Sequence, residues 1–267
     1  MLIDSHCHLD YPDLAKDREG ILARARNAGV ARMVNISTTR EDSEKVRKTA
    51  EANEDVYCSV GTHPHDVSKP GEDFSTDELI ERAKHPKVVG IGETGLDYYY
   101  NHSPHETQQA SFRAHIRAGI ASGLPIIVHS RDAEEDTARI LREEGQGTSK
   151  PTGVLHCFSS KRILVEEALK LGFYISLSGI LTFKKSEELR AIARDVPLDR
   201  LLVETDSPFL APEPYRGKTC EPAYVVNTAR VLADLKGISE AEIARVTTEN
   251  FFWLFKKVSR PQEEGRR

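Results

Sequence analysis

The sequence predicts a single-domain (β/α)8 barrel, because short apolar runs alternate with helical patterns along the whole chain. Eight such runs can be counted, and 267 residues suit one barrel of this kind. Histidines and carboxylates also close several of the runs. The same alternation is compatible with one structural rival, an open, doubly wound parallel sheet. We expect the domain to span residues 1–258.

The eight runs are apolar and partly β-branched, as expected of parallel strands buried on both faces. They cover residues 2–6, 30–36, 56–61, 88–92, 125–129, 153–156, 172–177 and 201–204.

Helical patterns fill the intervals between the strands. Pro104 suits a helix start, whereas Gly29, Gly123 and Gly145 stand where helices should stop. The predicted helices are 17–28, 40–53, 76–83, 105–122, 131–144, 161–171, 185–195, 221–235 and 239–255.

Composition narrows the class of protein. The net charge of −5 offers no global basic surface, so binding of a polyanion would need a local patch. The four cysteines are scattered without a CxxC pair, which favours a reducing compartment over a disulfide framework. No signal peptide pattern or membrane-length apolar run is present, so we expect a protein without membrane segments. The polar residues 259–267 are expected to form a disordered tail.

Ligand-type residues stand at corresponding places in successive units. His6 and His8 point to the same side of the first strand, because side chains alternate along a strand. Further histidines and carboxylates close later strands, and the carboxyl ends of barrel strands meet on one face. This pattern predicts a metal site built from His6, His8, Glu93, His129, His156 and Asp206.

Six ligands are too many for one catalytic ion that keeps an open position. We therefore expect two divalent ions that share Glu93, with His6, His8 and Asp206 on one ion and His129 and His156 on the other. Nitrogen and oxygen ligands suit zinc, manganese or iron, and magnesium is disfavoured but not excluded. Such a pair activates water for hydrolysis.

The count of ligands leaves His63 outside the metal shell. Asp206 or His63 is then the expected general base or acid. A loop hydrogen bond is the alternative role for His63, and His65 is expected to be a loop residue of that kind.

Cations that follow the strand ends could contact phosphates. They are Arg131, Lys161, Lys184, Arg216 and Lys218. Tyr98, Tyr99, Tyr100 and Phe183 are candidates for stacking on unpaired bases, or alternatively for packing at the barrel mouth, as we expect of Tyr98.

Motifs around these residues resemble those of the TatD family of metal-dependent deoxyribonucleases, within the amidohydrolase superfamily. They are Asp4-Ser-His-Cys-His-Leu, Gly61-Thr-His-Pro-His, Gly92-Glu-Thr-Gly-Leu-Asp-Tyr, Pro125-Ile-Ile-Val-His-Ser-Arg, His156-Cys-Phe-Ser, Glu204-Thr-Asp-Ser-Pro and Asn250-Phe. The resemblance implies a TIM barrel, a binuclear centre on the six ligands above, and hydrolysis of phosphodiesters, often from a 3′ DNA end. It also implies a role for His63 in catalysis or phosphate binding, and a cytoplasmic location.

The chain departs from the family pattern at one place. Cys220 stands in Arg216-Gly-Lys-Thr-Cys-Glu-Pro where the family usually has Asn. A thiol is a weaker hydrogen-bond partner than an amide, so the Arg216 loop could be looser, and a thiolate on the metal is a further alternative.

Three functions follow from these observations. The favoured one is a metal-dependent 3′-5′ exodeoxyribonuclease or phosphodiesterase, acting as a monomer on single-stranded DNA or 3′ ends with two divalent ions (zinc, manganese or magnesium). In this function His63, Arg131, Lys184 and Arg216 bind the substrate, and Asp206, Glu93 and His63 are catalytic. The second is a carbonyl hydrolase, such as a D-aminoacyl-tRNA deacylase. The third is a metal-holding scaffold without turnover.

Overall fold

A computed structural model describes residues 1–261 and contains one parallel sheet whose eight strands follow each other in chain order. The sheet closes because Cys7 pairs in parallel with Ser207, and the His8 N–H donates to the Ser207 carbonyl at 2.8 Å. This closure confirms the predicted barrel and excludes the open sheet. The strands are β1 (Leu2–Cys7), β2 (Val30–Asn35), β3 (Val56–Val60), β4 (Val88–Asp97), β5 (Ile126–Arg131), β6 (Gly153–Leu155), β7 (Tyr174–Leu177) and β8 (Leu201–Val203).

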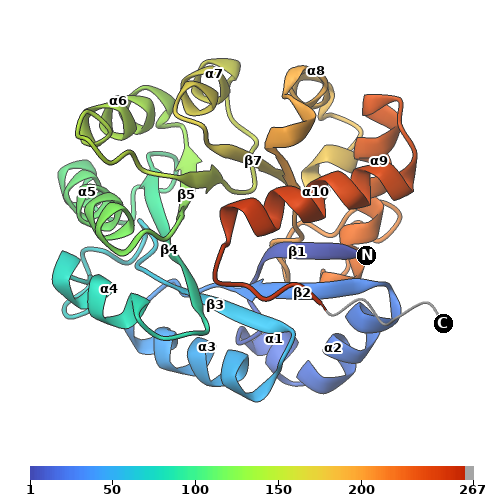
Figure 1. Cartoon of the computed structure of the whole chain (residues 1–267), viewed down its shortest axis with the longest axis horizontal. Helices are drawn as coiled ribbons and strands as arrows, with labels where there is room; N and C mark the ends of the chain where they lie inside the picture. Colours follow the sequence, from blue (N-terminus) through green and yellow to red (C-terminus); the bar gives the residue numbers. More distant parts are fainter. Residues whose placement is uncertain (262–267) are drawn as a thin grey trace.

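Helices surround the barrel as an outer ring (Figure 1). The α-helices are α1 (Pro12–Ala15), α2 (Arg18–Asn27), α3 (Arg40–Ala52), α4 (Thr76–Ala83), α5 (His105–Ser122), α6 (Glu134–Glu144), α7 (Arg162–Lys170), α8 (Glu187–Asp195), α9 (Val225–Lys236) and α10 (Glu240–Leu254). Short 3₁₀ helices are η1 (Gly179–Thr182), η2 (Leu198–Arg200) and η3 (Pro222–Tyr224). The sequence did not predict α1 or these 3₁₀ turns, because a single turn shows no helical periodicity.

Local chemistry explains several helix ends. Thr39 and Ser75 cap α3 and α4 in reciprocal capping boxes with Asp42 and Glu78, which satisfy backbone donors at the helix start. Gly123 ends α5 in the left-handed conformation, at φ 68°, which glycine adopts without steric cost.

The last helix closes one end of the barrel. In Figure 1, α10 lies across the strands. Its Phe251 and Phe255 belong to a buried cluster that takes side chains from the inside of the barrel. The Asn250 amide donates to the carbonyls of Leu198 and Leu201 at the start of β8. Because α10 covers the amino ends of the strands, the barrel is open at its other end, where the carboxyl ends of the strands lie.

Two strands, β4 and β5, end at least two residues later than the sequence predicts. β4 continues from Gly92 to Asp97, and β5 continues to Arg131, because Asp97 and Arg131 remain paired in the ladder. The predicted helix 131–144 therefore begins only at Glu134. Glycines explain the extension of β4, since Gly92 and Gly95 adopt φ values of 142° and 136° that side chains other than glycine rarely adopt.

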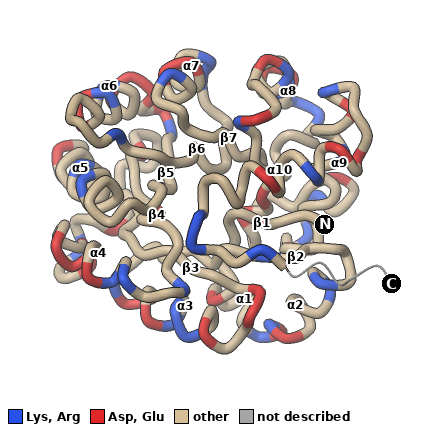
Figure 2. The backbone as a smooth tube through the Cα atoms, in the orientation of Figure 1, with Lys and Arg blue, Asp and Glu red and all other residues tan. Residues whose placement is uncertain are grey.

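Charged residues of both signs are interspersed along the outer helices, whereas the barrel strands contain few of them (Figure 2). No helix within residues 1–261 combines the length and apolar character needed to cross a bilayer. The predicted tail begins at Ser259, whose hydroxyl bonds to the Tyr57 hydroxyl at 2.7 Å. Residues 262–267 of that predicted tail lie outside the described residues.

Candidate metal centre

The predicted ligands gather at the carboxyl ends of the strands, around a pocket of about 740 Å³. Glu93 lies on β4, so it can face side chains from both halves of the ring. Residues that line the pocket include His8, His63, Glu93, His129, His156 and Asp206, and His6 lies directly beneath them.

One half of the centre is built from the first and last strands. The Nε2 atoms of His6 and His8 lie 3.3 Å apart. Asp206 Oδ1 lies 3.5 Å from the first and 3.3 Å from the second. Glu93 Oε2 faces the same pair, at 3.3 and 3.9 Å.

The other half surrounds the second oxygen of the same carboxylate. Glu93 Oε1 lies 3.3 Å from His63 Nε2, 3.3 Å from His129 Nδ1 and 2.7 Å from His156 Nε2. Glu93 therefore faces one group of imidazoles with each oxygen, which is the arrangement that a shared bridge requires.

Two carboxylates stand behind these imidazoles. His129 Nε2 lies 3.0 Å from Asp97 Oδ2, and His156 Nδ1 lies 3.3 Å from Glu204 Oε1. We assign a proton to each of these outer nitrogens, because a carboxylate can only accept. Carboxylates of this kind fix the tautomer and the ring orientation of metal-binding histidines.

This assignment tests whether a cation fits the centre. A neutral His129 or His156 then directs its inner lone pair at Glu93 Oε1, and two acceptors at 2.7–3.3 Å repel each other. A positive charge between them removes the repulsion. It is either a proton, because the neighbouring carboxylates outweigh burial and raise the pKa of both imidazoles, or a metal cation in the place of that proton. Three sets of mutually close ligand atoms exist in the described chain, namely His6–His156–Asp206, His6–His8–Glu93 and His63–Glu93–His129. The donor set therefore fits divalent cations bound by nitrogen and oxygen.

Electrostatics keep the carboxylates ionised. Burial would raise the pKa of Glu93, but the imidazoles of His156, His63 and His129 outweigh burial and hold it well below its ordinary value. Burial also opposes ionisation of Asp206, yet hydrogen bonding to His8 and the nearby imidazoles lower its pKa. Both groups are thus available as anionic ligands.

His63 differs from its neighbours in its hydrogen bonding. The His65 N–H donates to His63 Nδ1 at 3.2 Å, so we assign the proton of a neutral His63 to Nε2. Burial lowers the pKa of His63 to about 4, so the ring is neutral near pH 7. A metal ligand needs a lone pair at Nε2, whereas this His63 presents a donor there. The geometry therefore supports a role for His63 outside the metal shell, although its Nε2 lies close enough to be a ligand.

Backbone geometry places Glu93 and Asp206. A Cβ at Gly92 would lie 2.6 Å from the Ile127 carbonyl oxygen, and a Cβ at Gly95 would collide with the His129 carbonyl oxygen. These glycines allow β4 to approach β5 closely on both sides of Glu93. Asp206 adopts φ 58°, and its N–H donates to the His6 carbonyl at 2.9 Å, which joins the last ligand to the first.

The basic side chains predicted to bind substrate differ in their distance from the pocket. Arg131 lines the pocket, with its guanidinium 4.0 Å from the centre of the Tyr99 ring and 4.7 Å from that of Tyr100. Lys184 and Arg216 do not line the pocket, and the Arg216 guanidinium lies 3.8 Å above the Phe183 ring. Lys161 faces Glu134 at 3.7 Å.

Tyr98 packs behind the mouth as expected. Its ring stacks on His105 at 3.6 Å, and its hydroxyl donates to Asp136 at 2.8 Å. Cys220 is fully buried, and its N–H donates to the Pro208 carbonyl at 2.9 Å. Burial raises the pKa of the Cys220 thiol, and the close ligand groups do not include it.

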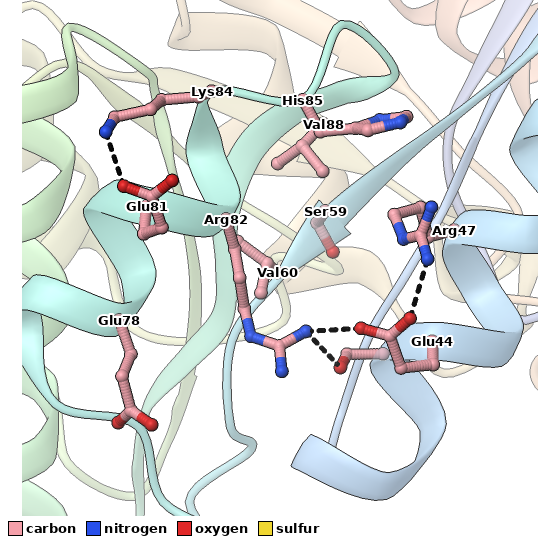
Figure 3. A pocket seen from close by; sticks show the side chains of 11 residues that line it. Glu44, Arg47, Ser59, Val60, Glu78, Glu81, Arg82, Lys84, His85 and Val88 are labelled. Atoms are coloured by element: carbon pink, nitrogen blue, oxygen red, sulfur yellow. Dashed lines mark hydrogen bonds and ion pairs between the residues drawn. The ribbon is translucent and has the colours of Figure 1, made fainter.

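A second pocket, of about 660 Å³, lies between α3 and α4 on the outer wall of the barrel (Figure 3). Its charged groups are paired with one another. An Arg82 guanidinium nitrogen lies 2.7 Å from Glu44, Arg47 also lies 2.7 Å from Glu44, and Lys84 pairs with Glu81. These groups neutralise each other. The candidate site is therefore the pocket at the carboxyl ends of the strands, which we call the mouth pocket.

The sequence reasoning missed Asp97 and Glu204 as supporting groups, although both stand inside the quoted motifs. Strand spacing offered a signal. Asp97 lies four residues after Glu93, and Glu204 lies two residues before Asp206, which are separations that keep strand side chains on one face.

Comparisons with known proteins agree with the barrel fold and identify the family of the chain. The family model described as TatD related DNase matches residues 3–256. The uncharacterized metal-dependent hydrolase YcfH of Escherichia coli K12 is 47% identical over 257 residues, which cover 95% of each chain. The 3′-5′ ssDNA/RNA exonuclease TatD of Shigella flexneri is 32% identical over 259 residues, covering 95% of this chain and 98% of the relative. The crystal structure of YJJV, a TatD homolog from Escherichia coli K12, superposes with a TM-score of 0.86 at 30% identity, covering 96% of this chain and 98% of YJJV. The chain therefore belongs to the TatD family of metal-dependent hydrolases.

Proposed function

We propose that this protein hydrolyses phosphodiester bonds at single-stranded DNA ends, as a 3′-5′ exodeoxyribonuclease with two divalent cations. One observation carries the proposal. Glu93 directs one oxygen at His6 and His8 and the other at His129 and His156. The same pocket is lined by Arg131, whose guanidinium forms no ion pair with a carboxylate of residues 1–261. The name of the Shigella flexneri relative supports the same substrate class.

The ions would be held by the residues that the sequence predicts, with Glu93 shared between His6, His8 and Asp206 on one side and His129 and His156 on the other. When bound, a pair of divalent cations lowers the pKa of water and stabilises the charge that develops on phosphate oxygens. Zinc, manganese and magnesium are the cations to test.

The side chains supply the remaining chemistry. Asp206 is ionised and 15% exposed toward the pocket, so its carboxylate can accept a proton from the attacking water. His63 presents Nε2–H, which can donate to a phosphate oxygen or to the leaving oxygen. Asp97 and Glu204 hold His129 and His156 in orientation.

Arg131 is the cation best placed for phosphate. It lines the pocket, and no carboxylate among residues 1–261 forms an ion pair with it. The rings of Tyr99 and Tyr100 hold its planar guanidinium, which can bind two phosphate oxygens.

The compartment and the oligomeric state belong to the same proposal. The four cysteines are all unpaired, which suits the reducing cytoplasm. We also propose that the protein acts as a monomer, since the six predicted ligands meet within one chain and the centre needs no residue from a second copy.

A direct assay separates the candidate functions. The purified protein, stripped of metal and then reloaded with each cation, is offered 5′-labelled single-stranded DNA, D-Tyr-tRNA and dihydroorotate. We expect DNA laddering that stops with EDTA. Deacylation without laddering would instead show a carbonyl hydrolase, and the absence of turnover with every metal would show a scaffold.

Asp97→Asn should weaken the centre without unfolding the protein. Asp97 accepts four hydrogen bonds, from His129, His65 and the N–H groups of Tyr99 and Tyr100, and an amide cannot accept all of them. Loss of such a supporting carboxylate costs about 10- to 100-fold in metal affinity or activity. Titration of activity against metal concentration measures the effect. Asp136→Asn, outside the pocket, is the control and should leave the titration unchanged.

Arg131→Ala should raise KM for single-stranded DNA by about tenfold, in line with the loss of one hydrogen-bonded charge, while metal content stays constant. Arg216→Ala should raise KM less, because its side chain lies outside the pocket lining. Arg230→Ala on the outer face of α9 serves as the control. Equal effects of all three substitutions would contradict the assigned role of Arg131.

A further inference from the structure

A half-exposed aromatic ring stands at the rim of the mouth pocket. The Phe209 side chain lines the pocket and is 51% exposed. Its ring approaches those of Tyr11, at 5.9 Å and nearly perpendicular, and His8, at 6.4 Å. Within residues 1–261 the other exposed aromatic side chains are Tyr99, Tyr100 and Trp253, and the two tyrosines stack on Arg131.

Hydrogen bonds and close packing hold the backbone that carries this ring. The Phe209 N–H donates to the Asp206 carbonyl at 3.0 Å, and the Pro208 carbonyl accepts from the Cys220 N–H at 2.9 Å. A Cβ at Gly179 would collide with the Leu210 carbonyl oxygen, so η1 packs closely against the same loop. Phe209 is therefore fixed three residues after a predicted metal ligand, on a loop that needs no ordering when a ligand binds.

The two sides of the pocket differ in chemistry. Around Phe209 the lining is apolar or aromatic, from Tyr11, Ile180 and Leu210. The side that follows β5 and β6 is polar and charged, and Arg131 lies there among Ser130, Asp132, Glu134, Ser159 and Ser160. Glu134 faces Lys161 at 3.7 Å, whereas Arg131 forms no ion pair with a carboxylate of residues 1–261 and is available for an anion. Because β8 and β1 lie across the ring from β4 and β5, the Glu93 centre lies between these surfaces. A nucleotide has the same division, with a flat, weakly polar base at one end and an anionic phosphate at the other.

We propose that Phe209 is the base-stacking residue of this site and receives the nucleobase of the nucleotide whose phosphate lies at the Glu93 centre. The proposal rests on the proposed function and deepens it. Every base presents a π face, so a single ring binds all four without sequence preference. A base must leave the duplex to be stacked on protein, so Phe209 directs the enzyme to unpaired ends.

Binding of small ligands tests this assignment without requiring turnover. The protein, reloaded with zinc and in parallel with manganese, is titrated calorimetrically with dAMP and with 2-deoxyribose 5-phosphate, which lacks the base. We expect the wild type to bind dAMP about tenfold more tightly, a difference of about 1.4 kcal/mol. Phe209→Ala should remove this preference and Phe209→Tyr should keep it. Trp253→Ala, an exposed aromatic on α10, is the matched control and should keep it.

The outcomes separate this inference from the proposed function. Equal binding of both ligands by the wild type, or a base preference that survives in Phe209→Ala, overturns the role of Phe209 whether or not DNA is cleaved. A Phe209-dependent base preference without DNA cleavage by any reloaded preparation supports the stacking role and overturns the nuclease. Thermal melting shows that the variants are folded, and Phe209→Leu tests loss of the aromatic ring with the apolar volume retained.

Discussion

Glu93→Ala should abolish nearly all hydrolysis and reduce the bound metal of the reloaded protein. Glu93 directs one carboxylate oxygen at each half of the centre, so its removal leaves the imidazoles of His129 and His156 without the anion that they share with His6 and His8. Loss of a carboxylate that merely supports a ligand costs about 10- to 100-fold, and loss of the bridge should exceed about 100-fold. Turnover on single-stranded DNA and metal content per chain are the measurements.

Two further variants make this result specific. Glu93→Gln keeps the shape of the side chain but removes the charge, and it should lose activity to a similar extent. Glu188→Gln, on the exposed surface of α8, should behave as the wild type. Retention of more than a tenth of the wild-type turnover by Glu93→Ala would contradict a shared bridge.

Gly95→Ala should have the largest effect on stability among the substitutions considered. The new Cβ would collide with the His129 carbonyl oxygen, and φ 136° is strained for alanine. Strain of this kind costs about 1–3 kcal/mol, and the collision with backbone adds to it, so we expect a loss of at least ~3 kcal/mol. For a chain of this size Tm should fall by roughly 6–12 °C.

Gly71→Ala is the matched control for this prediction. Gly71 also has a positive φ, of 79°, but open space surrounds the position of a Cβ. Its replacement should cost only about 1 kcal/mol, the strain of a left-handed residue. If thermal melting shows equal losses for both variants, close contact between β4 and β5 is not what requires Gly95. The collision also displaces the His129 backbone, so activity of Gly95→Ala should fall by more than unfolding alone explains.

The sequence by itself determined the barrel and the set of residues at its mouth. Buried parallel strands have a composition of their own, and residues that end successive strands must meet when the strands form one ring. Positions along the chain could therefore group His6, His8, Glu93, His129, His156 and Asp206, although the first and the last lie 200 positions apart in a chain of 267 residues.

Only the tertiary structure decided how those residues face each other. Side-chain rotamers and the close approach of β4 to β5 decide which oxygen of Glu93 faces which imidazole. The hydrophobic periodicity of the sequence predicts neither of them. The same holds for the protons that Asp97 and Glu204 fix on His129 and His156, and for the exposed position of Phe209. Lys184 and Arg216 follow strand ends in sequence yet do not line the pocket, because loop conformation, set by contacts distant in the chain, directs a side chain toward a site or away from it.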